Sequence, residues 1–452
     1  MIPRNRREYA YARNLAGEIG AFRSARICDP RRISAPFTSP LAQQLAPDLL
    51  ERFLRYVRVD TQSASDRDGS PSTPGQLELG RILVGELREI GLDDADVDEN
   101  GYVMATVPAS ADGGAPTVGL IAHLDTSPDA PGAGVEPLVH RDYDGAALKL
   151  PRGDTVLDPN AMPVLAGKLG HDIVTSSGDT LLGADDKSGV AEIMAAVAQL
   201  AAHPELPRPR LRICFTPDEE VGEGASLFNL ERFGAACAYT IDGSQPGELQ
   251  DETFSAAELR LVVHGVDIHP GWAQGKLVNA ARLAARILAA LPAEELTPET
   301  TSERQGYVHP HRIEGSSARA EIRVIARDFD DELLDRHVAL VRRTAEEVVA
   351  AEPRARLAVE VRRQYPNMRR FVERFPRVIE AAEQALRAEG LEPVRKPIRG
   401  GTDGSVLSER GLATPNLFTG GHEFHSVREW ASVQDMASAA ATIVRLAEAW
   451  AE

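Results

Sequence analysis

The sequence is poor in cysteine, in net positive charge and in long apolar runs, and each shortage excludes a class of protein. Its three cysteines, Cys28, Cys214 and Cys237, are far apart, which excludes a disulfide framework and a CxxC zinc site. No run approaches the roughly 18 apolar residues of a membrane span. The net charge of −18 argues against nucleic acid as the main partner, because an acidic surface repels a polyanion.

The N-terminal segment also lacks the apolar core of a secretory signal, and we therefore expect a cytoplasmic protein. Residues 1–40 carry eight arginines against three acidic residues. We expect 1–40 to form a basic, flexible extension, since such tails rarely carry chemistry; an organellar presequence or translation begun too far upstream are the alternatives.

The rest of the chain has the composition of a globular protein, with 43% hydrophobic and 26% charged residues among 452. Helical periodicity alternates with short apolar strands over 41–253 and 366–452, which predicts an α/β domain with a mostly parallel central sheet. Residues 125–180 show little periodicity and predict a long functional loop. Residues 254–365 follow a strand–helix–strand–helix–strand pattern, which predicts a smaller inserted α+β domain with one solvated sheet face.

Histidines and carboxylates stand at the ends of several predicted strands and at one helix start. Each has an ordinary explanation when taken singly: a strand-end histidine, a helix cap or a solvated acidic turn. Together they fall at the carboxyl edge of one sheet, where α/β proteins bind ligands, and they match the ligand set of two divalent ions. The set comprises His123, Asp125, Asp185, Asp186, Asp218, Glu219, Glu220, Asp242, His422, Glu423 and His425.

The order of these motifs resembles peptidase T, the tripeptide aminopeptidase family of the dinuclear zinc exopeptidase superfamily. The resemblance runs from about Leu49 to Arg445 and implies a zinc-exopeptidase-type catalytic domain interrupted by a lid or dimerisation domain. The segments that carry it are HLDT, LLGADDK, TPDEEVG, YTIDG, RDFD, PIRGGTDG and NLFTGG.

The resemblance implies two Zn²⁺ ions per subunit and a role for seven residues of the set, and it favours His425 over His422 as a ligand. It assigns different roles to Glu219 and Glu220, whereas the residue pattern alone does not say which of them is the base and which is the ligand. It also implies a cis peptide bond between Asp185 and Asp186. The implied metal ligands are His123 and Asp242 on the first ion, Glu220 and His425 on the second and Asp185 between them, with Asp125 behind His123 and Glu219 as general base.

The same resemblance implies substrate contacts from the inserted domain and from a glycine-rich loop. His269 is similar to a histidine that donates to the oxyanion, from its own closed domain or from a neighbouring subunit. Arg327 and Arg399 would hold the substrate's carboxylate or backbone oxygens, because a guanidinium fork suits a carboxylate; a salt bridge is the alternative for each. Gly401 would permit a close backbone approach. One departure from the family pattern is Ser244, where a glycine is usual.

We therefore expect a metal-dependent aminopeptidase that releases the N-terminal residue from tripeptides, by attack of a water shared by two zinc ions. Its partners would be short peptides, with no nucleic acid and no membrane, and the inserted domain offers a homodimer interface. One alternative is a dipeptidase, carboxypeptidase or deacylase of the same fold, which would share the ligands. The other is a non-catalytic, metal-bound peptide-binding protein, against which the presence of Glu219 and Asp185 argues.

Overall fold

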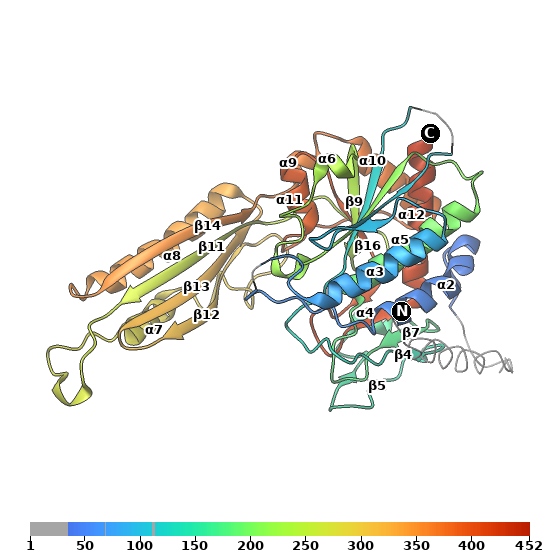
Figure 1. Ribbon diagram of the computed structural model, residues 1–452. Helices are drawn as coiled ribbons and strands as arrows, with labels where there is room; N and C mark the ends of the chain where they lie inside the picture. Colours follow the sequence, from blue (N-terminus) through green and yellow to red (C-terminus); the bar gives the residue numbers. More distant parts are fainter. Residues whose placement is uncertain (1–34, 68, 111–113) are drawn as a thin grey trace, which may run out of the picture.

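The computed structural model describes residues 35–67, 69–110 and 114–452, and it consists of an α/β body with a long arm on one side (Figure 1). Residues 1–34, most of the expected basic extension, lie outside this description. Among the described residues, no helix is both long enough and apolar enough to cross a lipid bilayer.

The body is built on an eight-stranded sheet of order β1-β2-β8-β3-β9-β16-β10-β15. The four central strands, from β8 to β16, are parallel, whereas antiparallel pairs occur toward the edges. The expected α/β class with a mostly parallel sheet is confirmed. The strands are β1 Asp96–Val97, β2 Val103–Val107, β3 Val118–His123, β8 Leu211–Thr216, β9 Cys237–Gly243, β10 Glu248–Gln250, β15 Val394–Arg395 and β16 Asn416–Phe418.

Helices cover both faces of this sheet, which explains why its central strands are apolar throughout. Every residue of β3 is buried, with Leu120 in the core of one face and Ile121 in the core of the other. The first face carries α2 Pro40–Tyr56, α3 Pro74–Glu89, α5 Ala184–Ala202, α10 Arg377–Ala388 and α12 Val433–Ala451, and the second carries the short helices α6 Leu230–Phe233 and α11 Asp403–Glu409.

The expectation of a long loop over 125–180 is wrong, because this region contributes strands to a second sheet in the body. That sheet has four very short strands. Two of its strands come from that region and two from residues 421–432, so no local periodicity could reveal it. Its order is β17-β18-β7-β4, with β4 Leu138–His140, β7 Ile173–Thr175, β17 Gly421–His422 and β18 Trp430–Ser432. The same region holds β5 Leu148–Lys149, β6 Val156–Leu157 and α4 Pro163–Ala166.

The arm is an antiparallel sheet of order β12-β13-β11-β14 with two helices on one face (Figure 1). The sequence pattern missed one strand, β12, because it is an edge strand that contains Pro310 and exposes most of its side chains. The elements are β11 Ser255–His264, α7 Ala280–Ala290, β12 Tyr307–Gly315, β13 Arg319–Asp328, α8 Asp331–Ala350 and β14 Arg356–Tyr365, after which α9 Arg369–Val372 returns to the body.

Candidate metal centre

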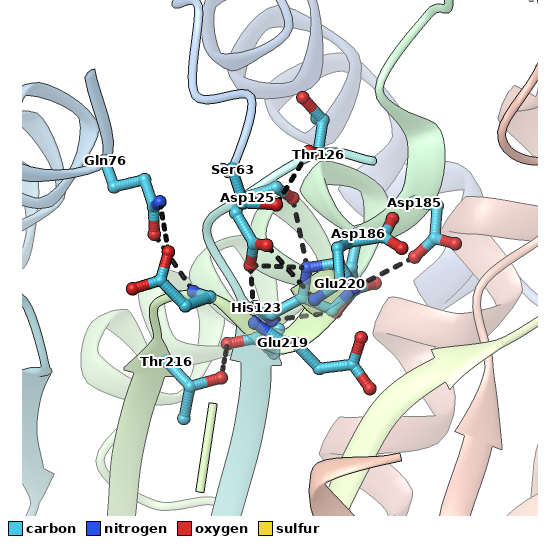
Figure 2. A network of polar contacts seen from close by, with 12 residues as sticks. Ser63, Gln76, His123, Asp125, Thr126, Asp185, Asp186, Thr216, Glu219 and Glu220 are labelled. Carbon is cyan, nitrogen blue, oxygen red and sulfur yellow. Dashed lines mark hydrogen bonds and ion pairs between the residues drawn. The ribbon is translucent and has the colours of Figure 1, made fainter. Parts of the chain in front are cut away.

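Five segments that are far apart in the sequence meet at the carboxyl edge of the main sheet. His123 ends β3, Asp185 lies at the start of α5 and Asp242 lies near the end of β9. Glu219 and Glu220 form a single 3₁₀ turn, Glu219–Val221, directly after β8. His425 lies in the connection between β17 and β18, so the small second sheet carries this residue to the site. Figure 2 shows the carboxylates of Asp125, Asp185 and Asp186 gathered around His123.

Asp185 lies between the two histidines and presents one carboxylate oxygen to each. Its Oδ1 is 2.9 Å from Nε2 of His123, and its Oδ2 is 3.3 Å from Nε2 of His425. Burial alone would raise the pKa of Asp185, but its hydrogen bonds to the two imidazoles hold that pKa below its usual value. A carboxylate in this position can serve two cations at once.

The remaining expected ligands belong to the same cluster, in which two groups of possible ligands share His123. Glu220 Oε2 lies 2.9 Å from Nε2 of His425, and Asp242 Oδ1 lies 3.8 Å from Nε2 of His123. The ligand atoms of His123, Asp185 and Glu220 lie within 4.8 Å of one another, as do those of His123, Asp186 and Asp242. The structure therefore brings together all five residues expected as metal ligands.

Asp186 also belongs to the cluster, although no ligand role was expected for it. Its Oδ2 accepts a hydrogen bond of 3.0 Å from the backbone N–H of His123, while its buried Oδ1 has no partner among the described residues. The peptide bond between Asp185 and Asp186 is cis, as expected.

Asp125 is fully buried behind His123 and holds three parts of the site. Its Oδ1 lies 3.3 Å from Nδ1 of His123, on the side of the ring that faces away from Asp185. The same carboxylate accepts the backbone N–H groups of Glu219 at 3.0 Å and of Glu220 at 3.1 Å. Asp125 thus orients the imidazole and the turn that carries both glutamates, so that its position matches the role expected for it.

The charges of the cluster fit bound divalent cations. Burial raises the pKa of Glu220 to about 7, and burial together with the neighbouring aspartates raises the pKa of Asp242 well above its usual value. Burial likewise raises the pKa of Glu219. In addition, Glu220 Oε1 is buried without a partner among the described residues. Buried carboxylates in excess over basic groups are costly unless metal ions or protons balance them, so these residues suit two metal ions.

Several residues that support the site escaped the sequence analysis. Glu429, fully buried, accepts the backbone N–H groups of Leu182, Gly183 and Asp185 at 2.7, 2.8 and 3.0 Å, which holds the loop before the Asp185 carboxylate in place. No local pattern marks Glu429, because its partners lie in a distant segment.

Two further supports do lie inside recognised motifs. Asp403, in the glycine-rich loop, accepts a hydrogen bond of 2.6 Å from Oγ1 of Thr216 at the end of β8. Asp218 precedes the two glutamates and accepts the backbone N–H of Ser72 at 2.8 Å and the amide of Gln76 at 2.7 Å. Asp403 and Asp218 could have been identified from the sequence, because both lie within motifs that the sequence analysis had already recognised.

The residues expected to bind substrate form a second cluster where the arm joins the body. Arg327 Nη1 donates to the hydroxyl of Tyr307 at 3.0 Å, and the Arg399 guanidinium lies 5.7 Å from the centre of the same ring. Gly401 lies against Tyr365, since an added Cβ would be 2.3 Å from that ring. Arg327 Nε and Arg399 Nη1 are buried and have no partner among the described residues, so neither arginine is fully engaged in a salt bridge.

His269 lies far from both clusters of the same chain. It is exposed in the loop after β11, beside Trp272, with 4.8 Å between the ring centres. Because β11 leaves the body at Ser255 and ends at His264, a strand of this length places the loop about 30 Å out along the arm (Figure 1). Within one chain the described structure does not bring His269 to the metal-ligand cluster.

Ser244, the departure from the family pattern, lies beside the cluster and not in it. Its hydroxyl donates to the carbonyl of Gly421 at 2.8 Å and lies 3.0 Å from Nδ1 of His422. His422 thus takes part in packing against Ser244, and it does not belong to either group of candidate ligands.

Known proteins resemble this chain over most of its length. The model of peptidase family M20/M25/M40 matches residues 181–449. A peptidase T of Vibrio parahaemolyticus is 47% identical over 400 residues, which are 88% of this chain and 98% of the relative. A peptidase T of Bacillus subtilis is 44% identical over 402 residues, 89% and 98% of the two chains.

Solved structures show the same fold. The aminopeptidase PepT of Bacillus cereus has a TM-score of 0.67 and 24% identity, over 90% of this chain and 99% of the other. A tripeptidase of Staphylococcus aureus has a TM-score of 0.70 and 21% identity, over 90% and 98%. Both likenesses extend to the body and the arm.

Proposed function

This chain belongs to peptidase family M20/M25/M40 and, within it, to peptidase T, and we propose that it removes the N-terminal residue from tripeptides at a pair of metal ions. It is a hydrolase, a tripeptide aminopeptidase. The observation that carries the proposal is the position of the Asp185 carboxylate between His123 and His425, with Glu220 and Asp242 on either side.

The metal ligands that we propose are His123, Asp185 and Asp242 for one ion and Asp185, Glu220 and His425 for the other. Zinc is the metal that we propose, since imidazole and carboxylate ligands suit it. When bound, the two ions supply a water of lowered pKa and polarise the carbonyl of the scissile bond.

The chain's own residues move the proton and hold the peptide. Glu219 lies in the same turn as Glu220, beside His123, Asp242 and Thr216 in the walls of the small cavity at the sheet edge. Its carboxylate takes the proton of the attacking water and returns it to the leaving amine. Asp125 keeps His123 and the glutamate turn in place for this transfer.

The arginine cluster recognises the other end of the substrate. Arg327 and Arg399 offer buried, unpaired N–H groups, and a peptide carboxylate is the acceptor that matches them. The loop around Gly401 allows the backbone of the bound substrate to approach this cluster closely. A carboxylate receptor at a set distance from the metals limits the substrate to short peptides.

His269 can serve the reaction only from a second copy of the chain, because its own arm holds it far from its own metal centre. We therefore propose a homodimer through the arm, residues 254–365, in which each His269 donates to the oxyanion at its partner's site. The exposed Trp272 beside it would then be covered.

A panel of Ala-Ala, Ala-Ala-Ala, Ala-Ala-Ala-Ala and an N-blocked tripeptide, assayed with metal analysis of the same sample, tests the proposal. We expect turnover of the free tripeptide alone and two metal ions per chain. Preferred cleavage of the dipeptide or of the blocked peptide would point to the dipeptidase or deacylase alternative. Bound metal without turnover of any peptide would point to a non-catalytic protein.

A further inference from the structure

One row of side chains crosses the end of the arm's sheet that lies nearest the body. In the strand register, Tyr307 is opposite Arg327, Arg327 is opposite Ala256, and Ala256 is opposite Tyr365. Residues directly opposite one another project from the same face of a sheet, so these four side chains share a face. The residue between Arg327 and Tyr365 in this row, Ala256, has a small side chain.

Tyr365 ends this row on the side of the metal centre. An added Cβ on Gly401 would lie 2.3 Å from Cζ of Tyr365, the carbon that bears the hydroxyl. The Glu219 carboxylate is close enough to contribute to the Tyr365 pKa, which burial chiefly raises, to about 12. The hydroxyl therefore stays protonated at neutral pH and remains a hydrogen-bond donor.

The Tyr365 hydroxyl is buried, yet it has no hydrogen-bond partner among the described residues. An unpaired buried hydroxyl costs free energy, and a site that leaves one open commonly fills it with ligand. The hydroxyl lies close enough to both Glu219, where the peptide bond would be cut, and Arg327, where the substrate carboxylate would bind, for each to act on it electrostatically.

A tripeptide has one acceptor at the matching position. From the scissile carbonyl to the terminal carboxylate its backbone spans two residues, about 7 Å. The carbonyl of its second peptide bond lies between these two ends. A dipeptide has no second peptide bond and so offers no such carbonyl.

We propose that the Tyr365 hydroxyl donates a hydrogen bond to the carbonyl oxygen of the tripeptide's second peptide bond, and so determines substrate length together with Arg327. This inference rests on the proposed function and adds a specificity residue to it. A substrate without that carbonyl leaves the hydroxyl unpaired, and such sites reject analogues that lack the matching group.

The test uses the metal-loaded protein and two substrates: Ala-Ala-Ala, and the same tripeptide with sulfur in place of oxygen in its second peptide bond. The variant is Tyr365→Phe. Its matched control is Tyr143→Phe, which removes another buried hydroxyl without a partner, in the region of the small second sheet. Metal content is measured for all three proteins.

We expect the sulfur substitution to lower kcat/KM of the wild type about tenfold, because a thioamide is a weak acceptor. Tyr365→Phe should lower kcat/KM for Ala-Ala-Ala by a similar factor, mainly through KM, and should respond little to the sulfur. Such a loss of coupling identifies the pair of groups that interact. Tyr143→Phe should behave as the wild type.

Three outcomes would overturn the inference. One is a wild type that cleaves both substrates equally, a measurement that does not depend on the variant folding. Another is a Tyr365→Phe protein with unchanged kinetics. The third is a loss confined to kcat that keeps the full sulfur effect, which would make Tyr365 an oxyanion donor. Wild-type protein that is metal-loaded yet cleaves no tripeptide would instead overturn the proposed function itself.

Discussion

Glu220 and His425 meet at 2.9 Å, Oε2 to Nε2, although one follows β8 and the other lies in the β17–β18 connection near the end of the chain. Glu219 is the next residue to Glu220, yet its carboxylate lines the cavity with His123 and Asp242. The 3₁₀ turn therefore directs the two neighbouring side chains to different partners. This difference is the physical reason why we assign Glu220 as a metal ligand and Glu219 as the general base.

Substitution of the two glutamates should separate these roles. Glu219→Gln should keep both metal ions and the fold while turnover falls by at least about 10²-fold, because an amide cannot accept the proton. Glu220→Gln should lower the metal content of one site. Turnover and metal content measured on the same samples check this, with exposed Glu223→Gln as the control from the same loop. Loss of metal from Glu219→Gln with retention by Glu220→Gln would reverse the assignment.

Removal of the metals should lower the melting temperature. A ligand at a hundred times its dissociation constant stabilises a fold by about 2.7 kcal/mol, and chelation removes that contribution. The measurement is a thermal melt before and after chelator treatment, with metal added back as the control. An unchanged melting temperature would show that the carboxylate cluster does not hold metal in the folded protein.

The metal-free protein should also become more stable as the pH falls from 8 to 6. Burial raises the Glu220 pKa to about 7, whereas in the unfolded chain a glutamate titrates near 4.3. The folded state therefore binds the proton more tightly, and this contribution is complete below the unfolded pKa and lost as pH rises through 7. Melting temperatures across this range check the sign. A metal-free protein that loses stability over the same fall in pH would contradict it.

Arg327→Ala should raise KM for tripeptides by about 10- to 100-fold, because it removes a charge-assisted hydrogen bond to the carboxylate. Metal content should stay the same. A C-terminally amidated tripeptide should lose affinity for the wild type but change little with the variant. Arg336→Ala, on the exposed face of α8, is the control. If the amide and the free acid respond alike to Arg327→Ala, the arginine does not bind the carboxylate.

Two inactive variants should restore activity when mixed, if His269 acts across a dimer. His269→Ala should lower kcat by about 10²–10³, the cost of one oxyanion donor. A mixed dimer of His269→Ala and Glu219→Gln contains one site with an intact glutamate from the first chain and an intact histidine from the second. Co-refolding of the two chains and assay of turnover check this. A mixture no more active than its components would refute the shared site.

Local patterns in the sequence determined the fold class and indicated a metal site at one sheet edge, whereas the roles of the residues within that site were implied by the family resemblance. Apolar runs such as residues 118–122 specify buried parallel strands, and the polar residues at their ends, such as His123, must then meet at one sheet edge. Those inferences need only the spacing of side chains along each strand and the types of ligand that a metal accepts.

Only the tertiary structure decided which residues support or complete that site. Glu429 holds the loop before Asp185, and Tyr365 joins Arg327 through the register of three strands, contacts between segments far apart in the chain. The edge strand β12 and the short second sheet likewise leave no periodic trace, because their pairing partners lie elsewhere in the sequence. Contacts of this kind arise from the packing of distant segments, which residue spacing alone does not encode.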